Sequence, residues 1–168
     1  MANQIEIERK YVIKKPDIDR LRKERGYTES RIVQIYLKSD PGVTHRVRER
    51  RYSDSVVYTE TKKTRIDSMS SHEEEHEINE AEFHSLSRKI REGTRPVLKT
   101  RYTFEYKDVT FEIDVYPDWK NTAIMETELD SRDEEVEIPS ILEIIKDVTG
   151  DRRYSNSAMS RTFPDELL

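Results

Sequence analysis

The feature that most constrains this chain is an alternation with period 2 in which charged residues gather on one face of a segment. Successive side chains of a strand point to opposite faces, so this alternation indicates β-strands. Glu112 and Asp114, for example, share a face opposite Phe111 and Ile113. The pattern predicts roughly eight strands, at Ile5 to Ile13, Arg31 to Lys38, Thr44 to Arg51, Val56 to Lys63, His72 to Ile78, Pro96 to Glu105, Val109 to Tyr116 and Thr122 to Leu129.

Other stretches have helical rather than alternating patterns, and each of them ends at a glycine. We predict helices over Pro16 to Gly26, Asn79 to Gly93 and Pro139 to Gly150. In the middle one, Phe83 and Leu86 begin an apolar stripe at helical spacing. Helices with apolar faces can cover the apolar faces of the strands.

The charged faces of the strands are sorted by sign. Glu126 and Glu128 share one face, whereas Arg46 and Arg48 share another. An ordinary sheet with one wet face explains any single strand, but a solvated face tends to mix its charges. We therefore predict an α+β fold, a closed eight-stranded antiparallel β-barrel with helices packed on the outside and the charged faces lining a tunnel. Residues 1–168 would form one such domain.

Composition excludes several classes of function. The chain has no cysteine, so thiolate nucleophiles and thiolate metal sites are absent. Its 30 basic and 35 acidic residues nearly balance and are interleaved, which disfavours a nucleic-acid or anionic-membrane partner. The start of the chain lacks a signal-peptide core and no run approaches a membrane span, so we expect a cytoplasmic protein.

Enclosed charges need partners, because an unpaired buried charge costs several kcal/mol. Clustered carboxylates such as Glu126 and Glu128 call for a hard, oxygen-loving cation such as Mg²⁺ or Mn²⁺. Clustered arginines and lysines call for a polyanion. A metal-bound polyphosphate satisfies both demands at once.

The order of these segments resembles that of the CYTH, or triphosphate tunnel metalloenzyme, superfamily. Glu6-Ile7-Glu8-Arg9-Lys10 matches the ExExK motif that opens the family's domain. Further matches follow in family order across essentially the whole chain: Gln34 to Leu37, Arg46 to Arg48, Thr61-Lys62, Glu75 to Ile78, Lys99 to Tyr102, Glu112 to Asp114, Glu126 to Glu128 and Arg153 to Ala158.

The resemblance implies a role for each matching position. The implied metal ligands, for what the family suggests are two ions, are Glu6, Glu8, Asp114, Glu126 and Glu128, and the other tunnel acids are Glu75, Glu77 and Glu112. The implied triphosphate-binding bases are Lys10, Arg46, Arg48, Lys62, Lys99, Arg101 and Arg161, with Arg152 or Arg153 as substitutes for the last. Either a second metal or the pair Lys62 and Tyr36 would activate the attacking water.

The fold alone does not select the chemistry, since one scaffold hosts several. The sequence looks most like the compact bacterial members that hydrolyse inorganic triphosphate or a small organic triphosphate. The alternatives are a class IV type adenylate cyclase, a thiamine triphosphatase with Trp119 as its aromatic platform, and a non-catalytic polyphosphate binder. The expected partner is a small-molecule triphosphate, and a homodimer is compatible with the sequence.

Overall fold

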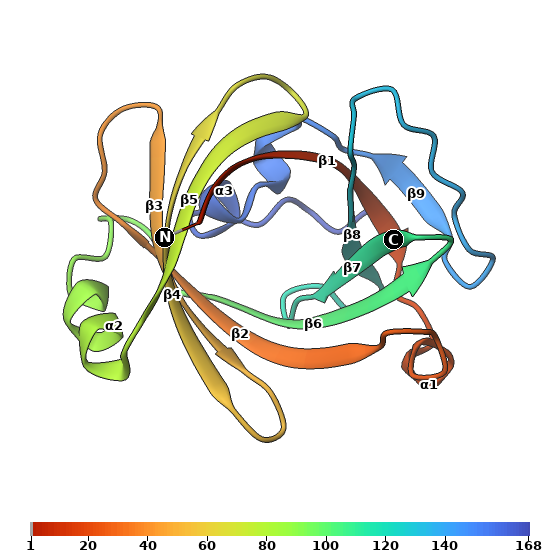
Figure 1. Ribbon diagram of the computed structural model, residues 1–168, viewed down its shortest axis with the longest axis horizontal. Helices are drawn as coiled ribbons and strands as arrows, with labels where there is room; N and C mark the ends of the chain where they lie inside the picture. Colours follow the sequence, from red (N-terminus) through yellow and green to blue (C-terminus); the bar gives the residue numbers. More distant parts are fainter. Residues whose placement is uncertain (1) are drawn as a thin grey trace.

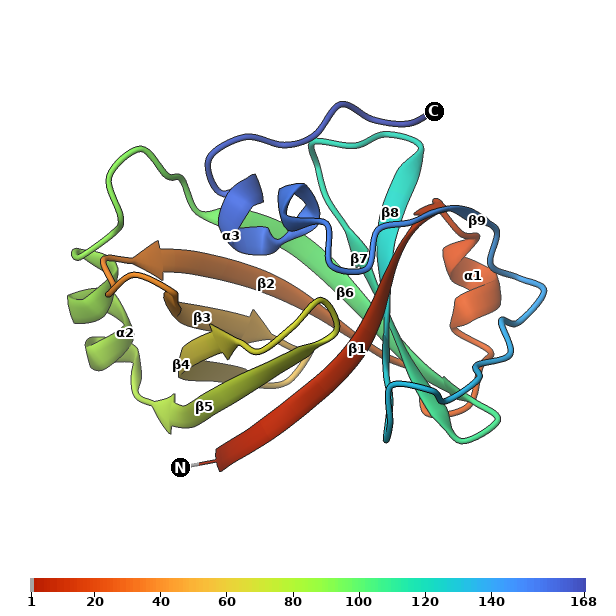
Figure 2. The ribbon, with the colours of Figure 1, turned by 90° about the horizontal axis from the view of Figure 1, so that it is seen from above.

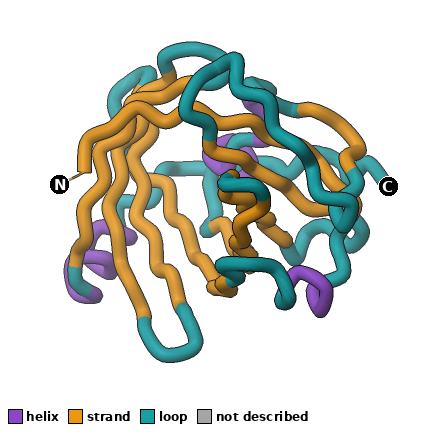
Figure 3. Tube along the Cα trace, turned by 45° about the vertical axis from the view of Figure 1, so that its right-hand side comes forward, coloured by secondary structure: helices purple, strands orange, loops and turns teal. Residues whose placement is uncertain are grey.

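The strands form one antiparallel sheet that closes on itself, as the computed structural model of residues 2–168 shows (Figures 1 and 3). The sheet order is β5-β4-β3-β2-β6-β7-β8-β1, and β1 also pairs with β5, so the prediction of a closed barrel is confirmed. The bounds are β1 Ala2–Lys14, β2 Thr28–Leu37, β3 Val43–Arg51, β4 Val56–Arg65, β5 Ser70–Ile78, β6 Val97–Tyr106, β7 Val109–Val115 and β8 Thr122–Glu128.

The predicted helix over Pro139 to Gly150 is wrong. This stretch contains turns and a ninth strand, β9 (Ile144–Asp147), which pairs with β1 outside the closed ring. The pairing of β5 with β1 ends at Ile7, so the backbone of β1 beyond it is open on that side. β9 fills this place with two β-branched residues, a residue type that favours extended structure.

The other helices are shorter than predicted and lie where expected. They are α1 (Ile18–Leu21) and α2 (Glu80–Ser87), and the tail adds a 3₁₀ turn, η1 (Arg152–Tyr154), and α3 (Asn156–Met159). Asn79 caps α2 by accepting from the Glu82 amide at 2.8 Å, the arrangement that its position in the sequence predicts. No helix within residues 2–168 is long and apolar enough to cross a bilayer.

Two apolar clusters cover the outer face of the barrel. They include residues of α1 and α2, which lie on opposite sides of the barrel (Figure 2). Phe83 of α2 packs on Ile35 and Val47, which face away from the charged interior. On the opposite side, Leu21 of α1 packs with Phe111, together with residues of the segment that precedes β9. Each fully buried side chain of this size stabilises the fold by about 1.5 to 3 kcal/mol.

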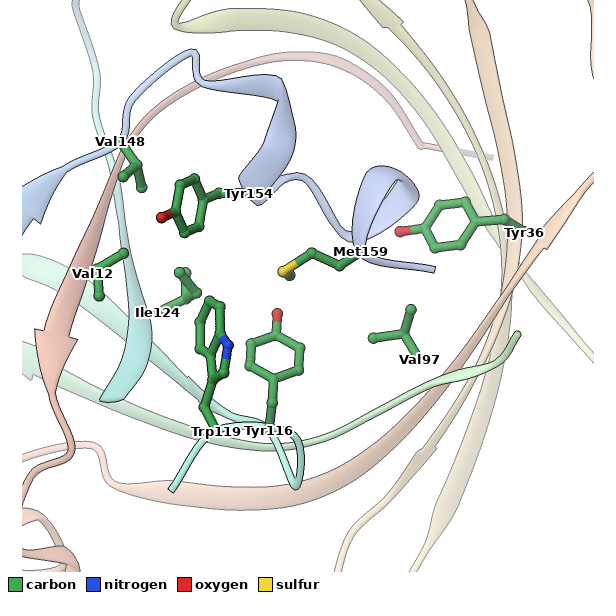
Figure 4. Packing of buried hydrophobic residues seen from close by; sticks show 9 residues of the cluster. All are labelled: Val12, Tyr36, Val97, Tyr116, Trp119, Ile124, Val148, Tyr154 and Met159. Carbon is green, nitrogen blue, oxygen red and sulfur yellow. The ribbon is translucent and has the colours of Figure 1, made fainter. Parts of the chain in front are cut away.

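A third cluster fills one end of the barrel interior and is made with η1 and α3 (Figure 4). The inward faces change from charged to apolar at this end, as Lys10 gives way to Val12 and Glu126 to Ile124. The cluster comprises Val12, Tyr36, Val97, Tyr116, Trp119, Ile124, Val148, Tyr154 and Met159. It closes this end of the tunnel and leaves a deep, charged cavity beside it.

Candidate functional site

The interior of the barrel contains a cavity of about 920 Å³. Its wall consists of the inward faces of the strands, the loops at the mouth and residues of η1 and α3. Most of the predicted site residues line it: Glu6, Glu8, Lys10, Tyr36, Arg46, Arg48, Glu75, Lys99, Arg101, Glu112, Glu126, Glu128 and Arg161. The alternation of the strands therefore brings residues from distant parts of the chain into one site.

Carboxylates dominate the wall formed by β1 and β8. The register places Glu8 opposite Glu128 and Lys10 opposite Glu126, and the Lys10 ammonium lies 3.3 Å from the Glu126 carboxylate. Burial, followed by the charge of Glu126, raises the pKa of Glu8 to about 8. Burial also raises the pKa of Glu128, as do neighbouring carboxylates. This wall therefore carries more negative charge than its own lysine balances.

Lys62, predicted as a phosphate-binding and catalytic residue, is exposed and does not line the cavity, so that prediction is wrong. The register pairs Thr61 with the inward-facing Arg46, which turns Lys62 outward and Lys63 inward. The Lys63 ammonium lies 3.2 Å from a Glu6 oxygen. The error is one residue, and in a strand one residue exchanges the two faces.

Arginines dominate the opposite wall, along β3. Arg46, Arg48 and Arg50 alternate along the strand and all face the cavity. Burial, followed by the charges of Arg46 and Arg101, lowers the pKa of Arg48 to about 9. Within residues 2–168, neither Arg46 nor Arg48 has a carboxylate within salt-bridge distance, and the buried Nε of Arg46 has no hydrogen-bond partner. These guanidinium groups are available to an anion.

Asp114 lies behind the residues that line the cavity, so the prediction that it is a metal ligand is corrected. It is 1% exposed, does not line the cavity, and both of its oxygens are occupied. Lys99 Nζ lies 2.8 Å from Oδ2, and Arg101 Nε and Nη2 lie 2.8 and 2.9 Å from Oδ1 and Oδ2. Arg101 also pairs with Glu112 at 2.9 Å. Asp114 therefore fixes two of the tunnel bases, which hold its pKa well below the usual range.

The Lys99 side chain is fully buried in the floor of the cavity. Burial lowers its pKa to about 7, and the charges of Arg101 and Arg48 act in the same direction against that of Asp114. Its ammonium also lies 3.4 Å from the amide oxygen of Asn156, a residue of α3. Of the lysines on the cavity wall, Lys99 is thus the one whose proton is held least firmly.

The structure also shows where other site residues lie. Glu77, predicted as a tunnel acid, is exposed and lies outside the cavity wall. Sequence reasoning missed Lys63, Glu73, Arg50, Arg91, Gln34 and Asn156. A correct register would have found Lys63, which stands next to the assigned Lys62, and Glu73, which alternates with the assigned Glu75. Nothing in the sequence marks Arg91, which follows α2 in a loop and donates to the Ser157 hydroxyl at 3.0 Å.

The donor chemistry of the acidic wall suits a divalent metal. Glu6, Glu8, Glu126 and Glu128 offer carboxylate oxygens, which hard ions such as Mg²⁺ and Mn²⁺ prefer. As they stand, no three acidic or histidine side chains of the described residues are close enough to enclose an ion. Burial is the first cause of the raised pKa values of Glu6 and Glu8, and the charge of Lys63, at 3.2 and 3.9 Å from these carboxylates, offsets it only in part. The residues therefore fit a cation that would draw them together.

Comparison with known proteins relates the chain to solved structures. No protein-family model and no curated protein matches it. The inorganic triphosphatase NE1496 is 28% identical over 95% of this chain and 96% of that one, with a TM-score of 0.58. The PH1819 protein from Pyrococcus horikoshii OT3 is 22% identical over 76% of this chain and 80% of that one, with a TM-score of 0.60. The second likeness supports the fold alone.

Proposed function

We propose that this chain, which its motif order and closed barrel make a member of the CYTH or triphosphate tunnel superfamily, is a metal-dependent phosphohydrolase. Its substrate would be inorganic triphosphate or a small organic triphosphate, cleaved at the terminal phosphate. One observation carries the proposal: a single cavity has clustered carboxylates on one wall, which outnumber the two lysines that pair with them, and guanidinium groups without carboxylate partners on the other. A triphosphate with bound metal supplies what each wall lacks.

Each wall has its own task in this proposal. Arg46 and Arg48 bind phosphate oxygens, for which a guanidinium offers a planar fork of donors. Glu6, Glu8, Glu126 and Glu128 would hold Mg²⁺ or Mn²⁺, and we propose two ions. Bound metal of this kind neutralises phosphate charge and lowers the pKa of water. The likeness to an inorganic triphosphatase over nearly the full length of both chains supports the assignment.

A lysine and a tyrosine face the same cavity as the phosphate-binding arginines. Lys99 takes the place of Lys62, because it lines the cavity and its pKa is lowered to about 7 by burial. An amine with this pKa is partly neutral near pH 7, so it can accept a proton from water. We propose that Lys99 acts in this way and that Tyr36 donates a hydrogen bond beside it.

The cavity offers little surface that could read a nucleobase or a thiazolium ring. Among the described residues that line it, Tyr36 is the one aromatic side chain. Trp119, the platform considered for thiamine triphosphate, is 4% exposed and packs edge to face with Tyr116 in the cluster that closes the barrel. Specificity therefore lies in the phosphate chain rather than in an attached organic group.

The test is a substrate panel of tripolyphosphate, ATP and thiamine triphosphate, each with Mg²⁺ or Mn²⁺, with phosphate and cyclic AMP both measured. We expect phosphate release to be fastest from tripolyphosphate and slower from ATP, without a cyclic product. A cyclase cannot act on tripolyphosphate, which has no ribose. Cyclic AMP formed from ATP, with tripolyphosphate left intact, would overturn the hydrolase in favour of the cyclase.

A further inference from the structure

Gln34, which the proposed function does not use, lies fully buried on the inner face of β2. The register places it directly opposite Arg48 of β3. Its Oε1 accepts from Arg48 Nε at 3.0 Å and from Arg48 Nη2 at 2.7 Å, and its Nε2 donates to the Tyr36 hydroxyl at 3.0 Å. A single amide thus joins two residues of the cavity wall.

The chemistry of the partners allows only one orientation of this amide. Arginine has donors and no acceptor, so the amide oxygen must face Arg48 and the NH₂ group must face Tyr36. The Tyr36 oxygen is therefore an acceptor in this contact, and its own proton has to point elsewhere. Tyr36 lines the cavity, so an occupant of the cavity can accept that proton.

The amide differs from the groups that hold the other tunnel bases. Asp114 pairs with Lys99 and Arg101, Glu126 pairs with Lys10, and these carboxylates cancel charge as they orient their partners. Gln34 makes the same kind of two-pronged contact to Arg48 without a negative charge. A buried arginine without a negatively charged partner lowers the stability of the fold unless a bound anion compensates its charge.

We propose that Gln34 is a positioning residue for triphosphate binding, which holds the Arg48 guanidinium without neutralising it and directs the Tyr36 hydroxyl proton into the cavity. This inference rests on the proposed function and deepens it. It explains why a neutral residue stands where a glutamate would make a stronger bond to the free arginine. The positive charge is kept for the substrate.

The decisive comparison is between Gln34→Glu and Gln34→Met. Gln34→Glu keeps acceptors against Arg48 and cancels its charge, whereas Gln34→Met removes the hydrogen bonds and leaves the charge. We expect Gln34→Glu to raise the KM for tripolyphosphate about 10- to 100-fold, the effect of losing one charge-assisted contact. Gln34→Met should raise it less. A merely structural role for Gln34 predicts the reverse order, because Gln34→Met loses more contacts.

The Tyr36 contact gives an independent readout. In the parent protein, Tyr36→Phe should lower kcat/KM about tenfold, the loss of one hydrogen bond to a charged oxygen. In Gln34→Glu the new carboxylate accepts the Tyr36 proton and turns it away from the cavity. Tyr36→Phe should then change kcat/KM less than about twofold in that background, a coupling that a double-mutant cycle detects.

Gln4→Glu is the matched control, since Gln4 is the other glutamine in the chain and sits exposed at the cavity wall. It adds the same charge without touching an arginine, and its KM should stay within about threefold of the parent. Calorimetric titration of tripolyphosphate in excess chelator repeats the comparison without turnover, and thermal unfolding checks that each variant folds.

Two results overturn the inference alone: KM raised more by Gln34→Met than by Gln34→Glu, or an undiminished Tyr36→Phe effect in the Gln34→Glu background. A parent protein that neither binds tripolyphosphate nor hydrolyses it with Mg²⁺ or Mn²⁺ overturns the proposed function, and the inference with it.

Discussion

Arg48 and Arg101 both face the cavity, yet replacing them should have opposite consequences. Arg101 makes three contacts of 2.8 to 2.9 Å to Asp114 and Glu112, and its side chain is 8% exposed. Arg48 is bonded to the neutral amide of Gln34 and lies near other cations. We expect Arg101→Met to damage the fold and Arg48→Met to damage substrate binding.

The magnitudes follow from what each substitution leaves behind. Arg101→Met leaves buried carboxylates without this partner, and removing one partner of a buried ion pair lowers the free energy of unfolding by about 3 to 5 kcal/mol. For a chain of this size, each kcal/mol shifts Tm by about 2 to 4 °C. Lys99 still compensates Asp114, so we expect the lower end of that range, about 3 kcal/mol, and a fall in Tm of about 6 to 12 °C. Arg48→Met removes a cation whose pKa burial already lowers and leaves only the neutral Gln34 amide without a partner, so Tm should fall less than in Arg101→Met.

Thermal unfolding gives Tm for both variants, and steady-state kinetics with tripolyphosphate give KM. Arg48→Met should raise KM about 10- to 100-fold, which corresponds to one lost charge-assisted contact. The reasoning is refuted if Arg48→Met lowers Tm as much as Arg101→Met does, or if it binds tripolyphosphate as tightly as the parent.

Three further predictions concern register, metal and pH. Lys63→Met should lower kcat/KM at least about tenfold, because it removes a charge-assisted contact inside the cavity. The outward-facing Lys62→Met should change kcat/KM by less than about twofold. Equal effects of the two variants would contradict the register. Excess chelator should abolish turnover. Added Mn²⁺ should restore turnover at least as well as Mg²⁺, since carboxylate sites bind Mn²⁺ more tightly. Turnover that persists in excess chelator would exclude a role for the metal. Asp67 accepts from the amides of Met69 and Ser70, chiefly that of Met69, which lowers its pKa to about 2 from 3.8. Its stabilising effect should therefore be fully present above about pH 4 and lost as the pH falls toward 2, so the difference in Tm between the parent and Asp67→Asn should shrink on acidification.

The sequence predicts the barrel well because strand alternation is a local property. Glu6 and Glu8 share a face by geometry alone, and the same holds for Arg46 and Arg48. The errors occur where the outcome depends on distant partners. Lys62 and Lys63 are adjacent and chemically alike, and only the pairing of Thr61 with Arg46 decides between them.

The helix predicted over Pro139 to Gly150 fails for the same reason. Its apolar residues fit a helical stripe, but the open side of β1 draws Ile144–Asp147 into a strand instead. The burial of Asp114 behind the cavity likewise depends on where Lys99 and Arg101 reach. The spacing of residues along a strand predicts which face of the strand a side chain lies on. How deeply that side chain is buried in the cavity wall depends on how its neighbours pack.

The pairing of β1 with both β5 and β8 has a consequence for how the barrel forms. β2 to β5 are joined in sequence order as neighbouring antiparallel strands, so their contacts are local and can form early. β1 can pair with β8 only after most of the chain has been made, since the register pairs Glu8 with Glu128. Long-range pairing of this kind slows folding, because the entropy of loop closure is lost before the contacts form. β1 is synthesised before the other strands of the barrel but is the last to gain both of its neighbours. Charged side chains on an unpaired strand disfavour its pairing with a neighbouring chain, and β1 carries such charges at alternate positions.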